Sequence, residues 1–382
     1  MTDSILTAEL VDESFPAADT WEILSDPQAL RALEPEWNEL WLRARDEYVT
    51  QSFAWCWAAW CTVGEPLGRR LHCVVARHAG KLVLVWPFTV RRVGAWTRAR
   101  PLGPEVAEYS TVLVERDARA ADRLAAAWKL LCRTIRSDMI LVPYVPAGSL
   151  LHGLLTGLRR LMTTEETPIS GLDCDAAGRA VLERVRGSKP LRRRRRQLAE
   201  RGTLVHERVA DPQRRAQLIE WLLPRKEEWI VRTGGEPIWR SLDLYRRFLL
   251  AAAADERLAV FALTLDGAVI AAFVARVDNV RVEQFVSVHD DEYRAYSPGQ
   301  LLRIDTVEWA FERGLAFDLR VGEHEYKKEW TSRRGLAVSY NISNSPFGTL
   351  AIAARAAQRR LASAFRARYP GRLKQGPTPV AD

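Results

Sequence analysis

Hydrophobic and polar positions alternate along most of the chain with periods that predict separate helices and strands. Within 26–46, Leu and Trp recur at spacings of three and four, which predicts one amphipathic helix. The next stretch, SFAWCWAAWC at 52–61, has the same spacing, and we expect its Trp side chains to pack in a core rather than to form an aromatic binding platform. Two β-rich runs then flank the turn RHAGK within 71–93 and predict a hairpin, and we expect a third strand near 109–115.

Two halves of the chain show a similar order of elements. The second half begins after about Leu172, and its pattern from Thr203 onward predicts the order β-α-α-β-β-β-α-β-α-β. The first half predicts a shorter version, α-α-β-β-β-α-β-α-β, which indicates a duplicated α/β domain. The expected elements are helices over 118–136, 150–161, 176–186, 191–201, 212–232, 242–253, 297–314 and 325–332, and strands over 138–144, 203–209, 257–265, 268–277, 280–288, 315–322 and 336–343.

Composition changes this picture at one place only. The 382 residues are 47% hydrophobic and 27% charged, as in an ordinary globular protein. The net charge is +8, yet the window 182–201 alone holds nine basic and two acidic residues, so the rest of the chain is close to neutral. Inside this window the run Arg192–Arg196 covers more than one helical turn, so its side chains point all around the helix. We therefore expect a surface helix, docked through Leu191 and Leu198, and not a flat DNA-binding face.

The positive field of this helix is expected to attract an anionic partner. The candidates are the phosphates of coenzyme A, a nucleotide-linked sugar, an acidic polysaccharide, a membrane surface, or tRNA. The alternative is that the arginines are simply solvated. The stretch 351–372 predicts a basic amphipathic helix, which is expected either to lie on a membrane or to pack on the protein.

Several classes of function lack their usual motifs. The five cysteines form no CxxC pair, and the six histidines are scattered without metal-ligand spacing, so we expect neither a disulfide framework nor a metal site. There is no GxSxG, HExxH or P-loop motif. The acidic N-terminus does not resemble a signal peptide, and no apolar run reaches the ~18 residues of a membrane span. We expect a cytoplasmic protein that is either free or peripheral to the inner membrane.

Two motifs in the second half are more specific. The sequences YRAYSPGQLL (293–302) and AFDLRVGEHEYKKEW (316–330) resemble the CelD-type acetyltransferases, a branch of the GNAT superfamily that is named for cellulose biosynthesis and is related to the Fem-type aminoacyltransferases. The resemblance covers about residues 20–345. It implies tandem GNAT domains in a mixed α/β fold: a tail at 1–20, a degenerate GNAT-like domain at 21–172, a GNAT domain at 173–345, and a basic helix and tail at 346–382.

The first motif is the candidate site for acetyl-CoA or another acyl-CoA. A helix that begins at Ser297 points its N-terminal N–H groups and its positive dipole end at an anion such as a diphosphate, and Gly299 permits close approach of the backbone. GNAT domains usually have a glycine-rich RxxGxG loop here, where this chain has RAYSPG. The resemblance further implies that the backbone of Val286 and Val288 pairs with the pantetheine amides. The other residues expected in this site are Tyr296 and Gln300.

The second motif is the candidate catalytic site. Acyl transfer to an amine needs a base for the ammonium and an acid for the leaving thiolate. Glu323 or Asp318 is a candidate base and Tyr326 a candidate acid, while Lys327 is a candidate for holding an anionic acceptor or an oxyanion. The alternative is that Asp318 caps a loop and that Lys327 is a solvated charge. Further candidate bases are Glu283 and His289.

These features together predict an acyltransferase that moves an acetyl or acyl group from acyl-CoA to an amine or hydroxyl acceptor. The acceptor is expected to be an anionic small molecule or saccharide, and the resemblance implies a role in polysaccharide or cell-envelope biosynthesis. One alternative is a Fem-like transferase that uses aminoacyl-tRNA. Another is a catalytically inactive module that binds a nucleic acid or a membrane surface, of which the nucleic acid is the less favoured partner.

Overall fold

The computed structural model describes residues 19–45, 48–103, 109–233, 242–354 and 357, and all statements about the structure refer to these residues. We call β1 to β8 the first half and α6 to β14 the second half. The first half contains β1 (Asp19–Leu24), α1 (Pro27–Ala32), α2 (Glu34–Trp41), β2 (Ala44–Arg45), η1 (Val49–Gln51), α3 (Phe53–Ala59), η2 (Trp60–Gly64), β3 (Arg70–His78), β4 (Lys81–Val93), β5 (Trp96–Pro101), β6 (Leu113–Glu115), α4 (Ala120–Thr134), β7 (Met139–Pro146), α5 (Leu150–Thr156) and β8 (Met162–Leu172).

The second half follows the expected order closely, with two helices ahead of its first strand. It contains α6 (Ala176–Arg186), α7 (Lys189–Ala199), β9 (Leu204–Val209), α8 (Pro212–Arg232), α9 (Leu242–Ala252), β10 (Leu258–Leu265), β11 (Ala268–Val277), β12 (Arg281–His289), η3 (Asp291–Tyr296), α10 (Pro298–Glu312), β13 (Ala316–Val321), α11 (Glu325–Glu329) and β14 (Arg333–Ser343).

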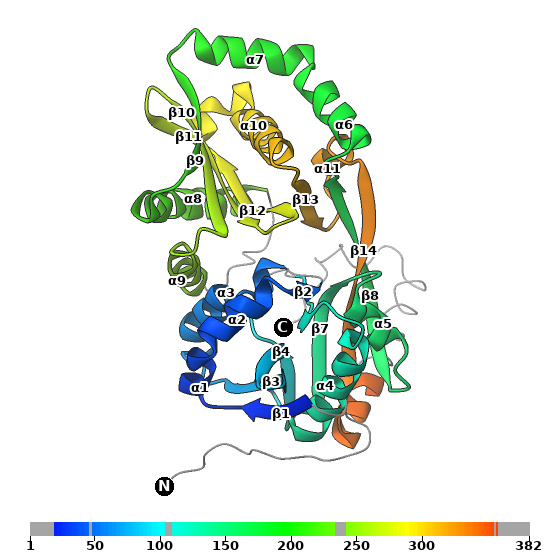
Figure 1. Cartoon of the computed structure of the whole chain (residues 1–382). Helices are drawn as coiled ribbons and strands as arrows, with labels where there is room; N and C mark the ends of the chain where they lie inside the picture. The colour runs from blue at the N-terminus through cyan, green and yellow to red at the C-terminus, as the bar shows by residue number, and fades with distance from the viewer. Residues whose placement is uncertain (1–18, 46–47, 104–108, 234–241, 355–356, 358–382) are drawn as a thin grey trace.

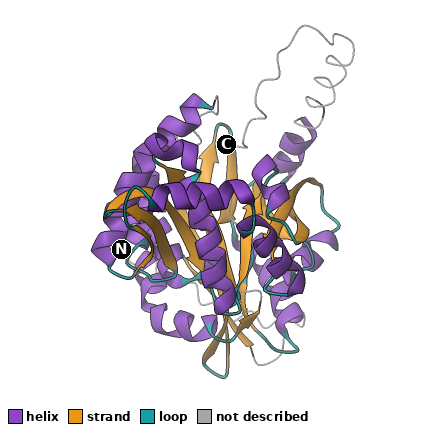
Figure 2. Ribbon diagram, turned by 90° about the horizontal axis from the view of Figure 1, so that it is seen from above, coloured by secondary structure: helices purple, strands orange, loops and turns teal. Residues whose placement is uncertain are grey.

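One mixed sheet of 14 strands runs through the described part of the molecule, and the helices lie outside it (Figure 2). Its main path is β1-β3-β4-β5-β7-β14-β8-β13-β12-β11-β10-β9. Two neighbouring pairs, β5 with β7 and β12 with β13, are parallel, and each joins strands separated by a helix along the chain. Parallel neighbours require such a crossover connection, whereas antiparallel hairpins do not. The repeated arrangement agrees with the duplication that the sequence predicts.

The two halves exchange their last strands. β8 ends the first half but lies between β13 and β14, and β14 ends the second half but lies between β7 and β8. β14 pairs with β8 from Arg333↔Gly171 to Ile342↔Met162 and also with β7 (Figure 1). Separation of the halves would leave the backbone groups of two long strands without partners, so the halves form one folding unit.

Three sequence predictions about the first half are wrong in detail. The single helix expected over 26–46 is two helices, because Pro35 occupies the first turn of α2 and the chain restarts its helix at Leu33. The strand expected near 109–115 is only the short β6, and the third ladder strand is β5 at 96–101. β1 was not expected, whereas β8 takes the place of the last strand in the expected order, for which the polar sequence suggested no bounds. The cysteines are all free, as expected, although Cys61 is exposed.

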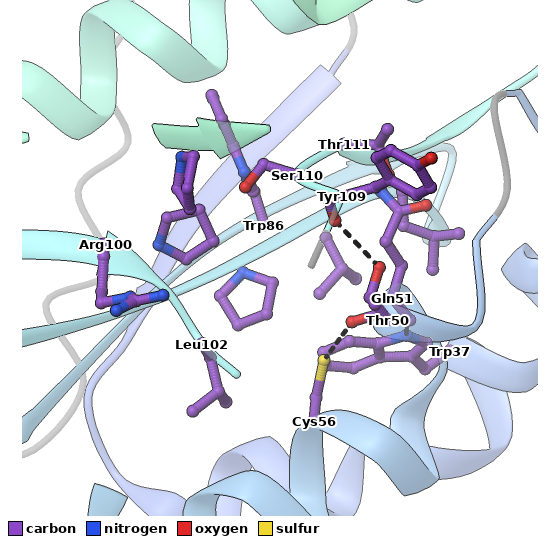
Figure 3. A pocket seen from close by; sticks show the side chains of 15 residues that line it. Trp37, Thr50, Gln51, Cys56, Trp86, Arg100, Leu102, Tyr109, Ser110 and Thr111 are labelled. Atoms are coloured by element: carbon purple, nitrogen blue, oxygen red, sulfur yellow. Dashed lines mark hydrogen bonds between the residues drawn. The ribbon is translucent and has the colours of Figure 1, made fainter. Parts of the chain in front are cut away.

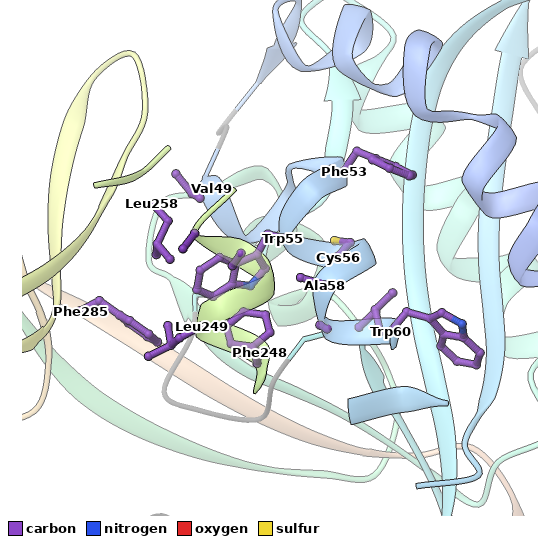
Figure 4. Close-up of a cluster of buried hydrophobic side chains, with 14 of the residues drawn as sticks. Val49, Phe53, Trp55, Cys56, Ala58, Trp60, Phe248, Leu249, Leu258 and Phe285 are labelled. Carbon is purple, nitrogen blue, oxygen red and sulfur yellow. The ribbon is translucent and has the colours of Figure 1, made fainter. Parts of the chain in front are cut away.

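A hydrophobic cluster joins the halves on one face of the sheet. The indole of Trp55 on α3 packs edge-on against Phe248 of α9 at 4.7 Å and against Phe285 of β12 at 5.6 Å (Figure 4). The Trp-rich segment therefore belongs to a core, as predicted, with Trp55 and Trp60 buried and Trp57 partly exposed. This packing places the first half directly under β12.

The strand exchange can be tested at a glycine. A Cβ on Gly171 of β8 would lie 2.8 Å from the backbone oxygen of Phe317 on β13, whereas a Cβ on Gly335 of β14 would meet nothing closer than 3.9 Å. We predict that Gly171→Ala lowers the free energy of unfolding by about 1–3 kcal/mol, while the control Gly335→Ala changes it by less than about 0.5 kcal/mol. Urea unfolding of both variants measures the two free energies. Equal stability of the variants would contradict the position of β8 next to β13.

Candidate active site

The parallel strands β12 and β13 separate part-way along their length. They pair at Arg281↔Ala316, Val282↔Phe317 and Glu283↔Asp318 and no further, although β12 continues to His289. A cavity of about 830 Å³ opens where they part, large enough for a cofactor-sized ligand. Residues from β12, the start of α10, the end of β13, α11, α8 and α9 line it.

Arg320 spans the gap between the two strands. Its backbone is left-handed, with φ of 67°, and its guanidinium Nη1 donates to the carbonyl of Phe285 at 3.2 Å. That carbonyl lies just beyond the last β12–β13 pair, so a side chain replaces the lost ladder partner. Burial, together with the nearby Arg276, lowers the pKa of Arg320. A strained residue with a buried charge thus sits at the point of separation.

The N-terminus of α10 faces the same cavity. Ser297 is its N-cap residue, as predicted, but its φ of 52° and ψ of 50° are left-handed and its side chain makes no capping hydrogen bond. The hydroxyl oxygen accepts instead from Nη1 of Arg194 on α7 at 2.8 Å. Ser297 thus adopts, at the place of the first glycine in the family loop, the backbone conformation that glycine favours. A Cβ on Gly299 would make only an ordinary contact, 3.7 Å from Nδ1 of His289.

The five arginines of the run Arg192–Arg196 differ in the residues that they contact. Arg195 pairs with Asp305 of α10 and Arg196 with Glu200 at 3.5 Å, while Arg192 and Arg193 are exposed. Arg194 differs from them, because it reaches the α10 N-terminus and none of the ion pairs among the described residues includes it. The segment is a surface helix docked through the buried Leu191 and Leu198, as predicted. The sequence did not single out Arg194 within the run.

The cavity lining is strongly cationic. It contains Lys226, Arg294, Arg303, Arg320 and Lys327. Among the described lining residues the one acidic side chain is Glu325, which pairs with Lys328 at 2.7 Å. Burial lowers the pKa of His289 and of His324, which also line it. A field of this sign favours anionic ligands.

Lys226 lies on the α8 side of the cavity without a carboxylate. Its ammonium is 3.9 Å from the centroid of the Trp229 ring, and none of the ion pairs in the described part of the chain includes it. Burial lowers the pKa of Lys226 to about 8. Lys226 was not among the predicted site residues, because a lysine in an amphipathic helix carries no signal of its own.

Tyr326 and Lys327 both line the cavity, but they differ in whether their polar groups are already used in hydrogen bonds within the protein. Burial raises the pKa of Tyr326, and the Arg303 guanidinium lies 4.6 Å from its ring centroid. Nζ of Lys327 donates to the carbonyls of Arg320, Val321 and Gly322 at 3.1, 2.8 and 2.9 Å. Burial lowers the pKa of Lys327 to about 8. Since the ammonium has three protons, these bonds use all of them, and Lys327 holds the turn after β13.

The acidic candidates lie outside the cavity lining. The buried carboxylate of Asp318 accepts from the Tyr109 hydroxyl at 3.1 Å and from the Arg320 N–H at 2.5 Å. Glu283 forms a buried ion pair with Arg276. Glu323 is exposed at the surface next to the cavity. This arrangement favours a structural role for Asp318 and Glu283.

The structure brings together most of the residues that the two motifs nominated. Ten residues were named as cofactor-binding or catalytic, and those that line the cavity are Val286, Val288, Ser297, Gly299, Gln300, Tyr326 and Lys327. The remaining three do not line it: Tyr296, whose ring lies 4.9 Å from the Arg201 guanidinium, Asp318 and Glu323. Of the further candidate bases, His289 lines the cavity and Glu283 does not.

Comparisons with known proteins agree with this geometry. A family model described as "Acetyltransferase (GNAT) domain" matches residues 186–328, which include most of the cavity lining. A search of curated proteins gives no match. Among solved structures, FemX superimposes with a TM-score of 0.61 at 12% identity over 87% of this chain and 100% of that one. A conserved protein of unknown function from Bacteroides thetaiotaomicron VPI-5482 gives 0.52 at 10% identity, over 81% and 97%.

These findings establish the fold and a GNAT acetyltransferase domain in the second half. At such low identities the structural similarity extends to the fold alone, and the CelD-type branch remains a hypothesis. No described helix has the length and apolar character to cross a bilayer.

The role of Lys327 in holding the turn after β13 can be tested against a lysine whose charge is exposed. We predict that Lys327→Met lowers the free energy of unfolding by about 2 kcal/mol or more, because three carbonyls of the turn lose their donor. Lys328→Met is the control, since Lys328 is exposed beside it and its loss should cost less than about 0.5 kcal/mol. Chemical denaturation compares the two. Equal stabilities would show that the ammonium does not hold the turn.

Proposed function

We propose that the protein is an acyltransferase that binds acyl-CoA between β12 and β13 and transfers the acyl group to an amine or hydroxyl acceptor. The observation that supports this most directly is the cavity at the separation of the two strands, with the start of a 15-residue helix at its edge. A thioester carrier needs a slot for an extended amide-bearing chain and a site for phosphates, and this geometry offers both.

The residues present fit acyl-CoA. The part of β12 beyond Glu283 has lost contact with β13, but the expected pairing of Val286 and Val288 with the pantetheine amides does not fit the register. Asp290 donates its N–H to the carbonyl of Ile270 on β11, so in this antiparallel ladder the backbone groups of Val286 and Val288 also turn toward β11, whereas those of Phe285 and Ser287 face the gap. The backbone of Ser287 is therefore suited to a pantetheine amide, and Val286 and Val288 remain lining residues.

The first turn of α10 lacks a side-chain cap, and the N–H of Gly299 together with Arg194 and Arg294 suits a diphosphate. Acyl-CoA, when bound, supplies the activated thioester.

Two side chains of the lining suit proton transfer. Tyr326 is held protonated by burial and is the candidate donor to the leaving sulfur. His289, whose lowered pKa keeps the imidazole neutral near pH 7, is the candidate acceptor of a proton from the amine or hydroxyl. Glu323 is a second candidate base at the rim. We assign Lys327 to positioning of the turn, because its protons are used within the fold.

The acceptor is proposed to be anionic. Lys226 presents a partly buried positive charge to the cavity and forms no ion pair with any carboxylate of the described residues. A carboxylate or phosphate on a small molecule or saccharide would complete this site. The resemblance to the CelD-type family suggests polysaccharide or envelope biosynthesis in the cytoplasm or at the inner membrane surface. On this proposal the first half, a degenerate copy of the domain at 21–172, shapes the acceptor side.

A Fem-like transfer from aminoacyl-tRNA is the second candidate. The observation in its favour is the pair of exposed arginines, Arg192 and Arg193, on the outer side of α7, where a nucleic-acid backbone can approach. An inactive binding module would use the same surface. Both predict RNA binding with steep salt dependence and no tight binding of acetyl-CoA.

The test of acyl-CoA binding uses two neighbouring arginines. Isothermal titration of the full chain with acetyl-CoA should show binding, and Arg194→Ala should weaken it about tenfold, because a charge-assisted contact worth about 1.4 kcal/mol is lost. Arg193→Ala, one residue away and exposed, should leave the affinity within about twofold. Absence of acetyl-CoA binding by the wild type contradicts the proposed function. Equal losses in both variants contradict only the role of Arg194.

Tyr326 can be tested for chemistry apart from binding. Tyr326→Phe removes the hydroxyl alone, so we predict a fall of at least about tenfold in thiol release from acetyl-CoA, with an unchanged dissociation constant for acetyl-CoA. The assay uses a panel of amino sugars and anionic amines as acceptors. Tyr293→Phe, which removes a hydroxyl outside the cavity lining, is the matched control. A variant Tyr326→Phe that is as active as this control rules out the proton transfer.

A further inference from the structure

The first half contains a second opening between parallel strands. β5 and β7 pair only at Arg98↔Met139 and Ala99↔Ile140. Their contact is therefore short, like that between β12 and β13. A separate cavity lies beyond these pairs and shares no lining residue with the acyl-CoA cavity (Figure 3). Its volume is about 40 Å³, which is room for about three water-sized groups at ~10–15 Å³ each.

Three buried polar side chains that line this cavity have an atom without a partner. They are Gln51, Trp86 and Thr111, which are 7%, 1% and 5% exposed, and the atoms are Nε2, Nε1 and Oγ1. Buried polar groups are almost always satisfied, so three unsatisfied atoms in the lining of one cavity indicate a missing occupant.

The orientation of Gln51 is fixed by its other atoms. Oε1 accepts from the N–H of Tyr48 at 3.3 Å, and the backbone carbonyl accepts from Nε1 of Trp37 at 2.8 Å. The side chain therefore keeps its amide nitrogen, which is a donor only, for the cavity. The indole N–H of Trp86 is also a donor only, and the hydroxyl of Thr111 can donate.

The charge around the cavity matches these donors. Among the described residues of the lining, Arg100 is the one charged side chain. Arg100, Pro101 and Pro143 are its partly exposed lining residues and mark its mouth, whereas the deeper wall includes the buried Leu102 and Leu113. An occupant with a negatively charged acceptor group fits such a site.

We propose that this cavity binds a small monocarboxylate, with its oxygens toward Gln51, Trp86 and Thr111 and its charge beside Arg100. A carboxylate group has three heavy atoms and fills the volume, whereas a phosphate ester or a nucleotide exceeds it. A cluster of three waters is the competing occupant. Water differs in that it needs acceptors for its own protons, and donor-only nitrogens cannot supply them.

The test compares carboxylates with other anions on the full chain. Thermal unfolding is followed in concentration series of formate and of acetate, with chloride and sulfate at matched ionic strength. The wild type should gain stability with formate or acetate in a saturable manner and not with the controls. Thr111→Val, which removes the hydroxyl at nearly constant volume, should weaken the apparent affinity at least tenfold.

Controls make each outcome decisive. Thr156→Val on α5 removes an exposed hydroxyl outside the cavity and should respond like the wild type. Gln51→Leu should behave like Thr111→Val, and if it does not fold, Thr111→Val decides. Equal stabilisation by chloride, a wild-type response in Thr111→Val, or a crystal structure grown in formate that shows only water in the cavity would overturn the proposal. The readout does not use acyl-CoA, so its failure leaves the proposed function untouched.

Discussion

The unpaired stretch of backbone between β12 and β13 is the feature on which the site depends. A sheet does not leave ladder groups without partners, and the cost of the gap is met by the Arg320 side chain, which satisfies the Phe285 carbonyl from a left-handed backbone position. Lys327 then fixes the turn that follows through three carbonyls. The cavity is therefore held open by side chains within the fold, before any ligand is present.

The first half of the chain supports this gap from outside the domain that contains it. The hydroxyl of Tyr109 donates to Asp318, which in turn accepts from the Arg320 N–H, and Trp55 packs on the ring of Phe285. The exchange of β8 and β14 ties these contacts to one continuous sheet. The first half thus supports the geometry of the site, although none of its described residues lines the cavity.

Local patterns predicted the elements of the second half and the motif residues that meet in the cavity, because periodicity and capping are local properties. The exchange of β8 and β14 could not be predicted: β8 is polar along much of its length, and its partners lie far away in sequence. Tyr326 and Ser297 were found through their motifs. Arg194 could not be distinguished in the sequence from the four arginines next to it. Lys226 belongs to no motif, and only the folded chain shows that it forms no ion pair with another described residue.

A crystal structure of the full chain with coenzyme A tests the central claim most directly. We expect the pantetheine arm along the unpaired part of β12 and the diphosphate at the first turn of α10, within hydrogen-bond distance of Arg194. We also expect β12 and β13 to remain separated beyond Glu283 and Asp318. Coenzyme A bound at another surface, or β12 and β13 joined by a continuous ladder of hydrogen bonds, would contradict it.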